Sequence, residues 1–218
     1  FLMIFVIPAF TTMFNSGGAE LPGPTAIVMA VSDTFRTKWY YMIGTAYGVY
    51  IIFNRLYATN RGRTVIDKYA LKLPVVGPLI RKVSIAKFSR TLGTLLSSGV
   101  ALIEGLEICA RTSGNKTVEL SVLQTIEAIK SGETIAAPLA RGKVFPPMVI
   151  QMIDVGENSG SLDTMLAKIS DFYDEEVDSA VEGLTALLEP ALMVFLGLVV
   201  GFIVVAMYLP IFKMGGGI

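Results

Sequence analysis

Hydrophobic residues recur every three or four positions through most of the 218-residue chain, and this spacing predicts helices rather than strands. Glycine and proline divide the pattern into segments of helical length. Between the last two long apolar runs, the pattern predicts helices at residues 63–73, 78–98, 101–113, 116–130, 134–141 and 147–158. The expected fold class is therefore all-α, with an antiparallel bundle of about six helices joined by short turns and with transmembrane helices beside it.

The last third of the chain, from Ser161 to Phe212, carries the most informative pattern. Apolar residues follow one helical face from Leu162 to Leu188, and the other face is acidic. After Glu189 the charges stop, and residues 190–212 form an uncharged run of 23 residues, about 35 Å long as a helix. The sequence therefore predicts an amphipathic, water-facing helix that leads directly into a membrane span. The sequence leaves open whether the helix is continuous through Glu189 and Pro190 or kinked there.

Two more apolar segments predict further membrane spans. One covers residues 38–57, whose tyrosine-rich part is flanked by Lys38 and Arg55, and the other is the end of a truncated span at residues 1–8. Basic residues are denser after the 38–57 span than before it, so the positive-inside rule places the following segment in the cytoplasm. The expected order is a span end at 1–8, a periplasmic connector at 9–37, a span at 38–57, a cytoplasmic helical domain at 58–185, a span at 186–212 and a periplasmic tail at 213–218.

Composition narrows the classes of function. A hydrophobic share of 53% and a mean hydropathy of +0.62 favour a mixture of membrane and water-facing segments, and the net charge of zero gives no reason to expect a nucleic-acid partner. The chain has no histidine, and its one cysteine, Cys109, lies in an apolar helical pattern typical of a core residue. No phosphate-binding glycine motif is present. We therefore expect no catalytic residue, no cofactor and no metal site.

A glycine-rich segment joins the last two predicted helices of the bundle. Gly160 is expected to be a left-handed C-cap, and Ser159 or Ser161 the N-cap of the next helix. Glu157 is in addition a candidate contact for a partner. The residues singled out around this hairpin and at the following helix junction are Gly156, Glu157, Ser159, Gly160, Glu189 and Pro190.

Two stretches of single-sign charge suggest a contact surface. The acidic stretch lies within a helical pattern rather than at the alternating loop positions of a calcium site, so a solvated helix face is the plain interpretation. The sharper hypothesis pairs it with a basic stretch, as in a docking surface or a subunit contact. The candidate contact residues are Arg81, Lys82, Lys87, Arg90, Asp174, Glu175, Glu176 and Asp178.

Pairs of glycines four residues apart occur in both complete predicted spans. Gly44 with Gly48, and Gly197 with Gly201, match the pattern that lets transmembrane helices approach closely, within a chain or between chains. Residues 190–212 contain no charged residue, whereas an ion pathway normally keeps such groups at depth. The spans are therefore interpreted as anchors and packing surfaces.

A set of short motifs occurs in order along essentially the whole chain. The motifs are Leu21-Pro22 with Thr25, Pro74-Val75-Val76-Gly77, Arg90-Thr91-Leu92, Ser98-Gly99-Val100, Phe145-Pro146, Gly156-Glu157-Asn158-Ser159-Gly160, Tyr173-Asp174-Glu175-Glu176-Val177, Glu189-Pro190 and Tyr208-Leu209-Pro210-Ile211-Phe212. Together they resemble the PilC/GspF family of inner-membrane platform proteins from type IV pilus and type II secretion machines.

The resemblance implies a multi-pass protein of the bacterial inner membrane that is not an enzyme. Such a platform couples a hexameric cytoplasmic assembly or retraction ATPase to the extraction of pilin or pseudopilin and to filament assembly. The implied partners are that ATPase, the pilin or pseudopilin, inner-membrane alignment proteins, membrane lipid and further copies of the chain. The resemblance also implies that this chain holds the C-terminal portion of such a protein.

Two other classes of function remain open at this point. A membrane transporter or channel subunit could use the bundle as a regulatory domain, although the uncharged spans argue against it. A membrane-embedded enzyme would need a polar catalytic pair at membrane depth, which the sequence does not show. The mechanism we favour is mechanical, with the helix from Ser161 onward passing motion from the bundle to the membrane.

Overall fold

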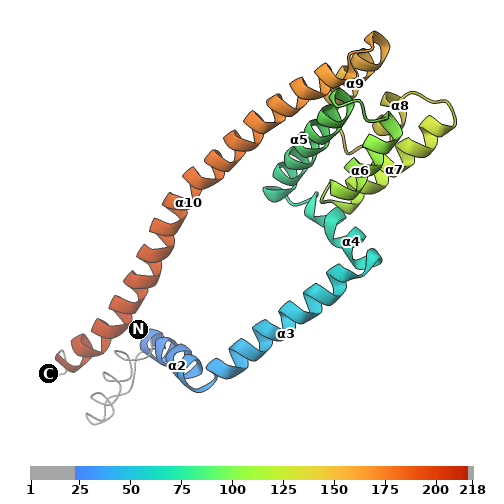
Figure 1. Ribbon diagram of the computed structural model, residues 1–218. Helices are drawn as coiled ribbons and strands as arrows, with labels where there is room; N and C mark the ends of the chain where they lie inside the picture. Colours follow the sequence, from blue (N-terminus) through green and yellow to red (C-terminus); the bar gives the residue numbers. More distant parts are fainter. Residues whose placement is uncertain (1–22, 216–218) are drawn as a thin grey trace. The chain divides into compact units, whose positions relative to one another are not determined.

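The computed structural model describes residues 23–215 and contains nine helices and no strand within that range (Figure 1). This confirms the all-α prediction. The chain divides into two compact units, one formed by residues 55–184 and the other by residues 1–54 and 185–218. The predicted span end at 1–8 and the first part of the predicted connector lie outside the described residues, as do residues 216–218 of the predicted tail.

The unit of residues 55–184, called the helical unit below, holds most of the predicted bundle. The cytoplasmic domain at 58–185 stays a prediction. Each helix expected from the hydrophobic pattern is present. The helices are α4 (Asn60–Ala70), α5 (Val76–Ser97), α6 (Leu102–Thr112), α7 (Lys116–Lys130), α8 (Ala136–Arg141), α9 (Pro147–Ser159) and the first part of α10 (Leu162–Gly215).

The ends of these helices differ from the prediction by up to three residues. The first differs most, since α4 begins at Asn60 and ends at Ala70, well before Pro74. Hydrogen bonds between residues three apart end the helix. Lys72 N donates to Tyr69 O at 2.9 Å, and Leu73 N donates to Ala70 O at 3.3 Å. The chain therefore leaves the helix before the proline constrains it.

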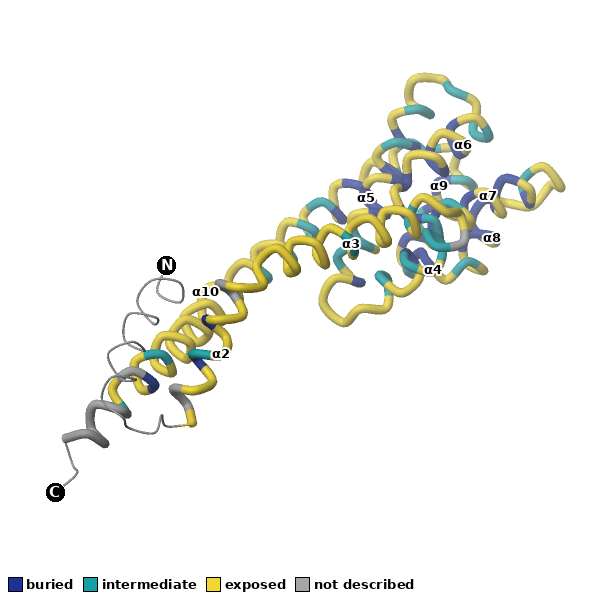
Figure 2. Tube along the Cα trace, turned by 90° about the horizontal axis from the view of Figure 1, so that it is seen from below, coloured by how far each residue is buried: buried dark blue, intermediate teal, exposed yellow. Residues whose placement is uncertain are grey.

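The core of the helical unit is built from side chains of every helix from α5 to α10. Figure 2 shows the buried residues gathered in this part of the chain. The ring of Phe88 on α5 lies 5.0 Å from that of Phe145, which precedes α9. Gly93 lets α10 approach α5, because a Cβ at Gly93 would stand 3.3 Å from the Cβ of Leu166. The largest fully buried side chains are Phe88, Ile85, Leu92, Leu106, Ile135, Leu139, Ile153, Leu166, Ile169, Val118, Val122 and Val149.

The second unit contains α2 (Gly23–Thr37), α3 (Trp39–Ala58) up to Asn54, and α10 from Thr185 onward. Its small described core joins Val28 of α2 to Ala206 of α10. Helix α3 has no buried residue, and its large apolar side chains are exposed. Such a surface requires a covering of lipid or protein.

Helix α10 has 54 residues, which corresponds to about 80 Å at 1.5 Å per residue. It stays helical through Glu189 and Pro190, the junction where the sequence left continuity open, and it extends to Gly215, into the segment predicted as a tail. Among the described helices it alone is long and apolar enough to cross a membrane, with a mean hydropathy of 2.5 in an 18-residue window that has no buried residue. Helix α3 does not reach the same threshold, because tyrosines, Asn54 and Arg55 lower its hydropathy, so a span at 38–57 stays a prediction.

Candidate functional site

The two charged stretches predicted from the sequence lie side by side in the helical unit, on α5 and on the first part of α10. Lys82 Nζ lies 2.6 Å from Glu176 Oε2. Arg90 forms an ion pair with Asp174, and its Nε donates a hydrogen bond to Ser170 Oγ at 3.0 Å. The structure therefore brings the basic and acidic stretches together within one chain.

These ion pairs are partly exposed. The side chains of Lys82 and Glu176 keep 29% and 42% of their surface exposed, and those of Arg90 and Asp174 keep 62% and 41%. Water screens such pairs, so each is expected to add only about 0.2–1 kcal/mol to stability. Their main effect is to set the register of α5 against α10.

The other four candidate contact residues have a different environment. Arg81, Lys87, Glu175 and Asp178 are exposed, and within the described part of the chain they have neither a hydrogen bond nor an ion pair. Their role as contacts to a partner or to a second subunit therefore stays a prediction.

Two hollows are lined by residues of both α5 and α10. One of about 530 Å³ is lined by residues of both helices, including Arg90, Thr94, Asp163 and Asp171. Another, of about 360 Å³, lies at the turn before α5, where Lys72, Arg81 and Lys82 surround apolar residues and the buried Tyr173. The second hollow is basic, because no acidic residue lines it.

The hairpin between α9 and α10 has the left-handed C-cap expected at Gly160, whereas an N-cap bond from Ser159 or Ser161 to α10 stays a prediction. Gly160 has φ 70°, and Ser161 N donates a hydrogen bond to Gly156 O at 2.9 Å. Only glycine reaches this left-handed conformation without a steric cost. Gly156 has a second role, since a Cβ there would stand 3.0 Å from Leu162 Cα and would push the two helices apart. The Ser159 hydroxyl donates to Val155 O at 2.7 Å.

Glu157 has a partner inside the chain. Both of its carboxylate oxygens accept from the backbone N–H of Ile135, at 3.1 and 2.9 Å. Ile135 is the N-cap residue of α8, where backbone N–H groups have no partner within the helix. The carboxylate therefore fixes the start of α8 against α9, a role that the sequence analysis did not foresee.

A second internal carboxylate was also missed from the sequence. Asp67 on α4 is 5% exposed and accepts from Lys116 N, at the start of α7, at 2.6 Å. Tyr57 Oη donates to its other oxygen at 3.4 Å. The available signal was weak: Asp67 is the only acid between Arg55 and Ile103. Asp67 and Lys116 are 49 positions apart in the sequence, so no local pattern indicates their contact.

The single thiol has the environment of a core residue. Cys109 is 1% exposed, and burial raises the pKa of its thiol to about 12. A thiol with so high a pKa stays protonated at neutral pH and is a poor nucleophile. Among residues 23–215 no group of three His, Cys, Asp or Glu side chains is arranged to hold a metal ion.

The predicted close packing of the transmembrane helices is not seen at the four glycines. A Cβ built at Gly44, Gly48, Gly197 or Gly201 would meet nothing within 4 Å. The positions are open, so a contact with another helix at these sites stays a prediction.

The sequence of the chain is similar to those of known proteins. The sequence model of the family "type II secretion system (T2SS), protein F" matches residues 88–210. The chain is 49% identical over 217 residues to the type IV pilus assembly protein PilC of Myxococcus xanthus, covering 100% of this chain and 52% of that protein. It is 45% identical over 217 residues to PilC of Thermus thermophilus, covering 99% and 53%. It is 33% identical over 218 residues to the type II secretion system protein F of Xanthomonas campestris, covering 100% and 54%.

The chain spans about half the length of these relatives. The family match includes part of α5, all of α6 to α9 and α10 as far as Pro210. It thus covers the acidic stretch, the hairpin and the apolar part of α10. The chain belongs to the type II secretion system protein F family, which the PilC/GspF resemblance of the sequence indicated.

Proposed function

We propose that the protein is part of an inner-membrane platform that couples a cytoplasmic ATPase to pilin or pseudopilin extraction and filament assembly. Family membership supports the setting, because the relatives carry the names of type IV pilus assembly and type II secretion proteins. The observation that carries the mechanism is α10. One helix includes residues packed in the core of the helical unit, such as Leu166 and Ile169, and also an exposed apolar segment after Glu189.

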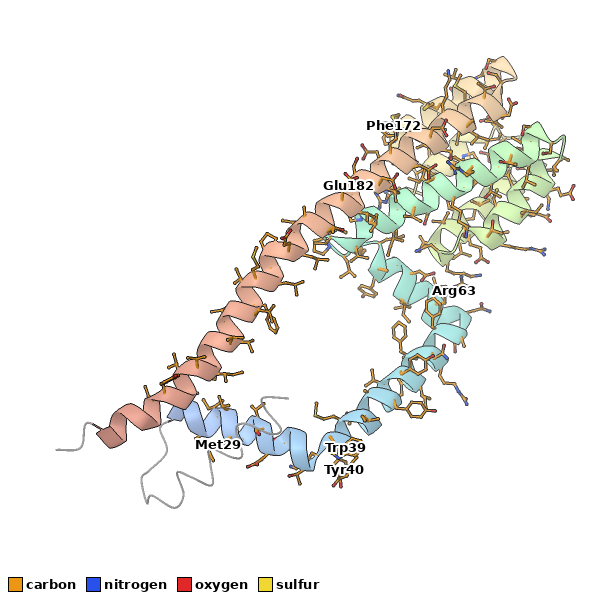
Figure 3. All side chains as sticks on the ribbon, turned by 60° about the vertical axis from the view of Figure 1, so that its left-hand side comes forward. Met29, Trp39, Tyr40, Arg63, Phe172 and Glu182 are labelled. Atoms are coloured by element: carbon orange, nitrogen blue, oxygen red, sulfur yellow. The ribbon has the colours of Figure 1, made fainter. Side chains whose placement is uncertain are left out.

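In this mechanism the helical unit receives force from the ATPase and α10 passes it toward the membrane. A helix transmits displacement along its axis because backbone hydrogen bonds link its successive turns, and α10 stays helical through Pro190 although that residue donates none. The last buried residue of α10 in the helical unit is Tyr173. Glu182 lies further along α10, and Figure 3 shows it on the same helix beyond Phe172. A flexible insertion after Glu182 would therefore break the connection without removing core side chains.

The test is a four-residue Gly-Ser insertion after Glu182 in the full-length protein, in a host that makes type IV pili or secretes through this system. We expect the variant to accumulate in the membrane at normal abundance but to assemble no filaments, as seen by electron microscopy. The matched control is the same insertion after Glu133, in the exposed turn between α7 and α8. It should leave assembly intact, since surface turns tolerate insertions. Normal filament assembly with the Glu182 insertion would refute the mechanical connection.

A further inference from the structure

Helix α4 has two chemically different faces. Its inward face carries Arg63, Asp67 and Ala70, and Asp67 joins it to the start of α7. The opposite face carries Val65, Lys68 and Tyr69, which are exposed. Positions three and four apart share one side of a helix, so these residues form one apolar and basic strip.

Exposed apolar side chains also occur in the turn that follows the helix. Val65 and Tyr69 are 53% and 66% exposed, and Leu73 and Val75 in the following turn are 52% and 57% exposed. Lys72 Nζ stands over the Tyr69 ring, 6.0 Å from its centroid. Four large apolar side chains thus lie on a short exposed segment among lysines, which is the composition of an interfacial membrane element.

Charge favours one kind of partner for this strip. The segment from residue 55 to residue 103 contains one acid, Asp67, which is buried and already bonded. The basic residues of that segment are Arg55, Arg61, Arg63, Lys68, Lys72, Arg81, Lys82, Lys87 and Arg90. Three of them, Arg63, Lys82 and Arg90, already pair with carboxylates within the chain. The basic hollow at the turn, lined by Lys72 and Arg81, adds a place where a phosphate could be held. Such clustering next to a membrane segment attracts anionic headgroups.

Chain connectivity points to the same partner. Only Thr59 separates α4 from α3, whose large apolar side chains are exposed along its length. We propose that α4 and the α4–α5 turn bind the surface of an anionic phospholipid bilayer, with Val65, Tyr69, Leu73 and Val75 in contact with lipid. This proposal rests on the membrane location in the proposed function.

Fluorescent probes on single cysteines in the full chain, reconstituted in nanodiscs, test the proposal. Val75→Cys reports on the strip, and Val155→Cys on α9 is the matched control, since the exposed fractions of the two side chains are 57% and 54%. The two sites lie near different ends of the first part of α10. The α4–α5 turn lines a hollow together with Tyr173, whereas Gly156, next to Val155, packs closely against Leu162. Cys109 is buried and stays unlabelled. Doxyl-labelled lipid is the quencher, in discs of phosphatidylcholine with or without phosphatidylglycerol.

We expect lipid quenching at Val75→Cys in discs with phosphatidylglycerol, and little at Val155→Cys. Replacing Lys68, Lys72 and Arg81 with glutamine should weaken the quenching, with each charge worth about fivefold in the population bound to the surface. A probe at Val194→Cys, in the apolar part of α10, should be quenched in both kinds of disc.

The proposal is overturned if quenching at Val75→Cys is no greater than at Val155→Cys, or if it does not depend on lipid charge. It is also overturned if the Val75→Cys probe is shielded both from doxyl lipid and from acrylamide, a quencher in the aqueous phase. This last result would indicate a protein partner. Failure at Val194→Cys would instead overturn the membrane placement of the proposed function.

Discussion

At the scale of single residues, two carboxylates hold the helical unit together by binding backbone N–H groups at helix starts. Glu157 binds Ile135 N before α8, and Asp67 binds Lys116 N at α7. An ionised acceptor at such a place gains from the charge and from the unpaired N–H groups of the helix start. Residues that look like surface acids in the sequence thus act as internal connections between helices.

The first prediction concerns Glu157. Replacement by glutamine removes the charge and leaves one oxygen acceptor, so we expect the free energy of unfolding to fall by about 1–2 kcal/mol. Urea titration of the purified protein in detergent measures this. The control is Glu127→Gln, whose carboxylate is 74% exposed and pairs only with Lys130, and whose effect should stay within about 0.5 kcal/mol. Equal effects of the two substitutions would contradict the helix-start role.

Sequence reasoning succeeded at the residue scale where the cause is local. The left-handed Gly160 was predictable because a tight turn after a helix needs a residue that accepts positive φ. Glu157 and Asp67 were not, since their partners lie 22 and 49 residues away along the chain. Only the packing of the helices brings those groups together.

At the scale of elements, the charged faces of α5 and α10 form a pair within the chain. The sequence predicted the two stretches and their complementarity, because single-sign runs are visible along the chain. It left open whether the pairing joins two molecules or two helices of one molecule. The distances assign Lys82, Arg90, Asp174 and Glu176 to internal pairs, which leaves Arg81, Lys87, Glu175 and Asp178 exposed for other contacts.

A charge exchange between the helices is the second prediction. Lys82→Glu places like charges opposite one another and should lower the free energy of unfolding by about 1 kcal/mol. The double variant Lys82→Glu with Glu176→Lys should restore most of that loss, in stability and in filament assembly alike. Lys87→Glu, at an exposed position without a pair among the described residues, is the control and should leave stability nearly unchanged. If the double variant stayed as unstable as the single one, the internal pair would not be the cause.

At the scale of the whole chain, the prediction concerns which side of the membrane each segment occupies. From the basic residues after α3, the positive-inside rule predicts that the helical unit lies in the cytoplasm and α2 on the opposite side. Single cysteines at Asp33 on α2 and at Lys130 on α7, both exposed, can be treated with a membrane-impermeant maleimide in intact cells. We expect labelling at Asp33→Cys alone, and at both sites after the membrane is made permeable. Labelling of Lys130→Cys in intact cells would show that the orientation is wrong.

Pro190 gives α10 a marker of depth in the bilayer. Proline has no backbone N–H, so Pro190 cannot donate the hydrogen bond that a non-proline residue would give to the carbonyl of Ala186. An unpaired carbonyl costs several kcal/mol in hydrocarbon but little where headgroups and water can bond to it. We therefore expect Ala186 to lie in the headgroup layer and the hydrocarbon interior of the bilayer to begin about one turn later, beyond Glu189, the last acid of the chain.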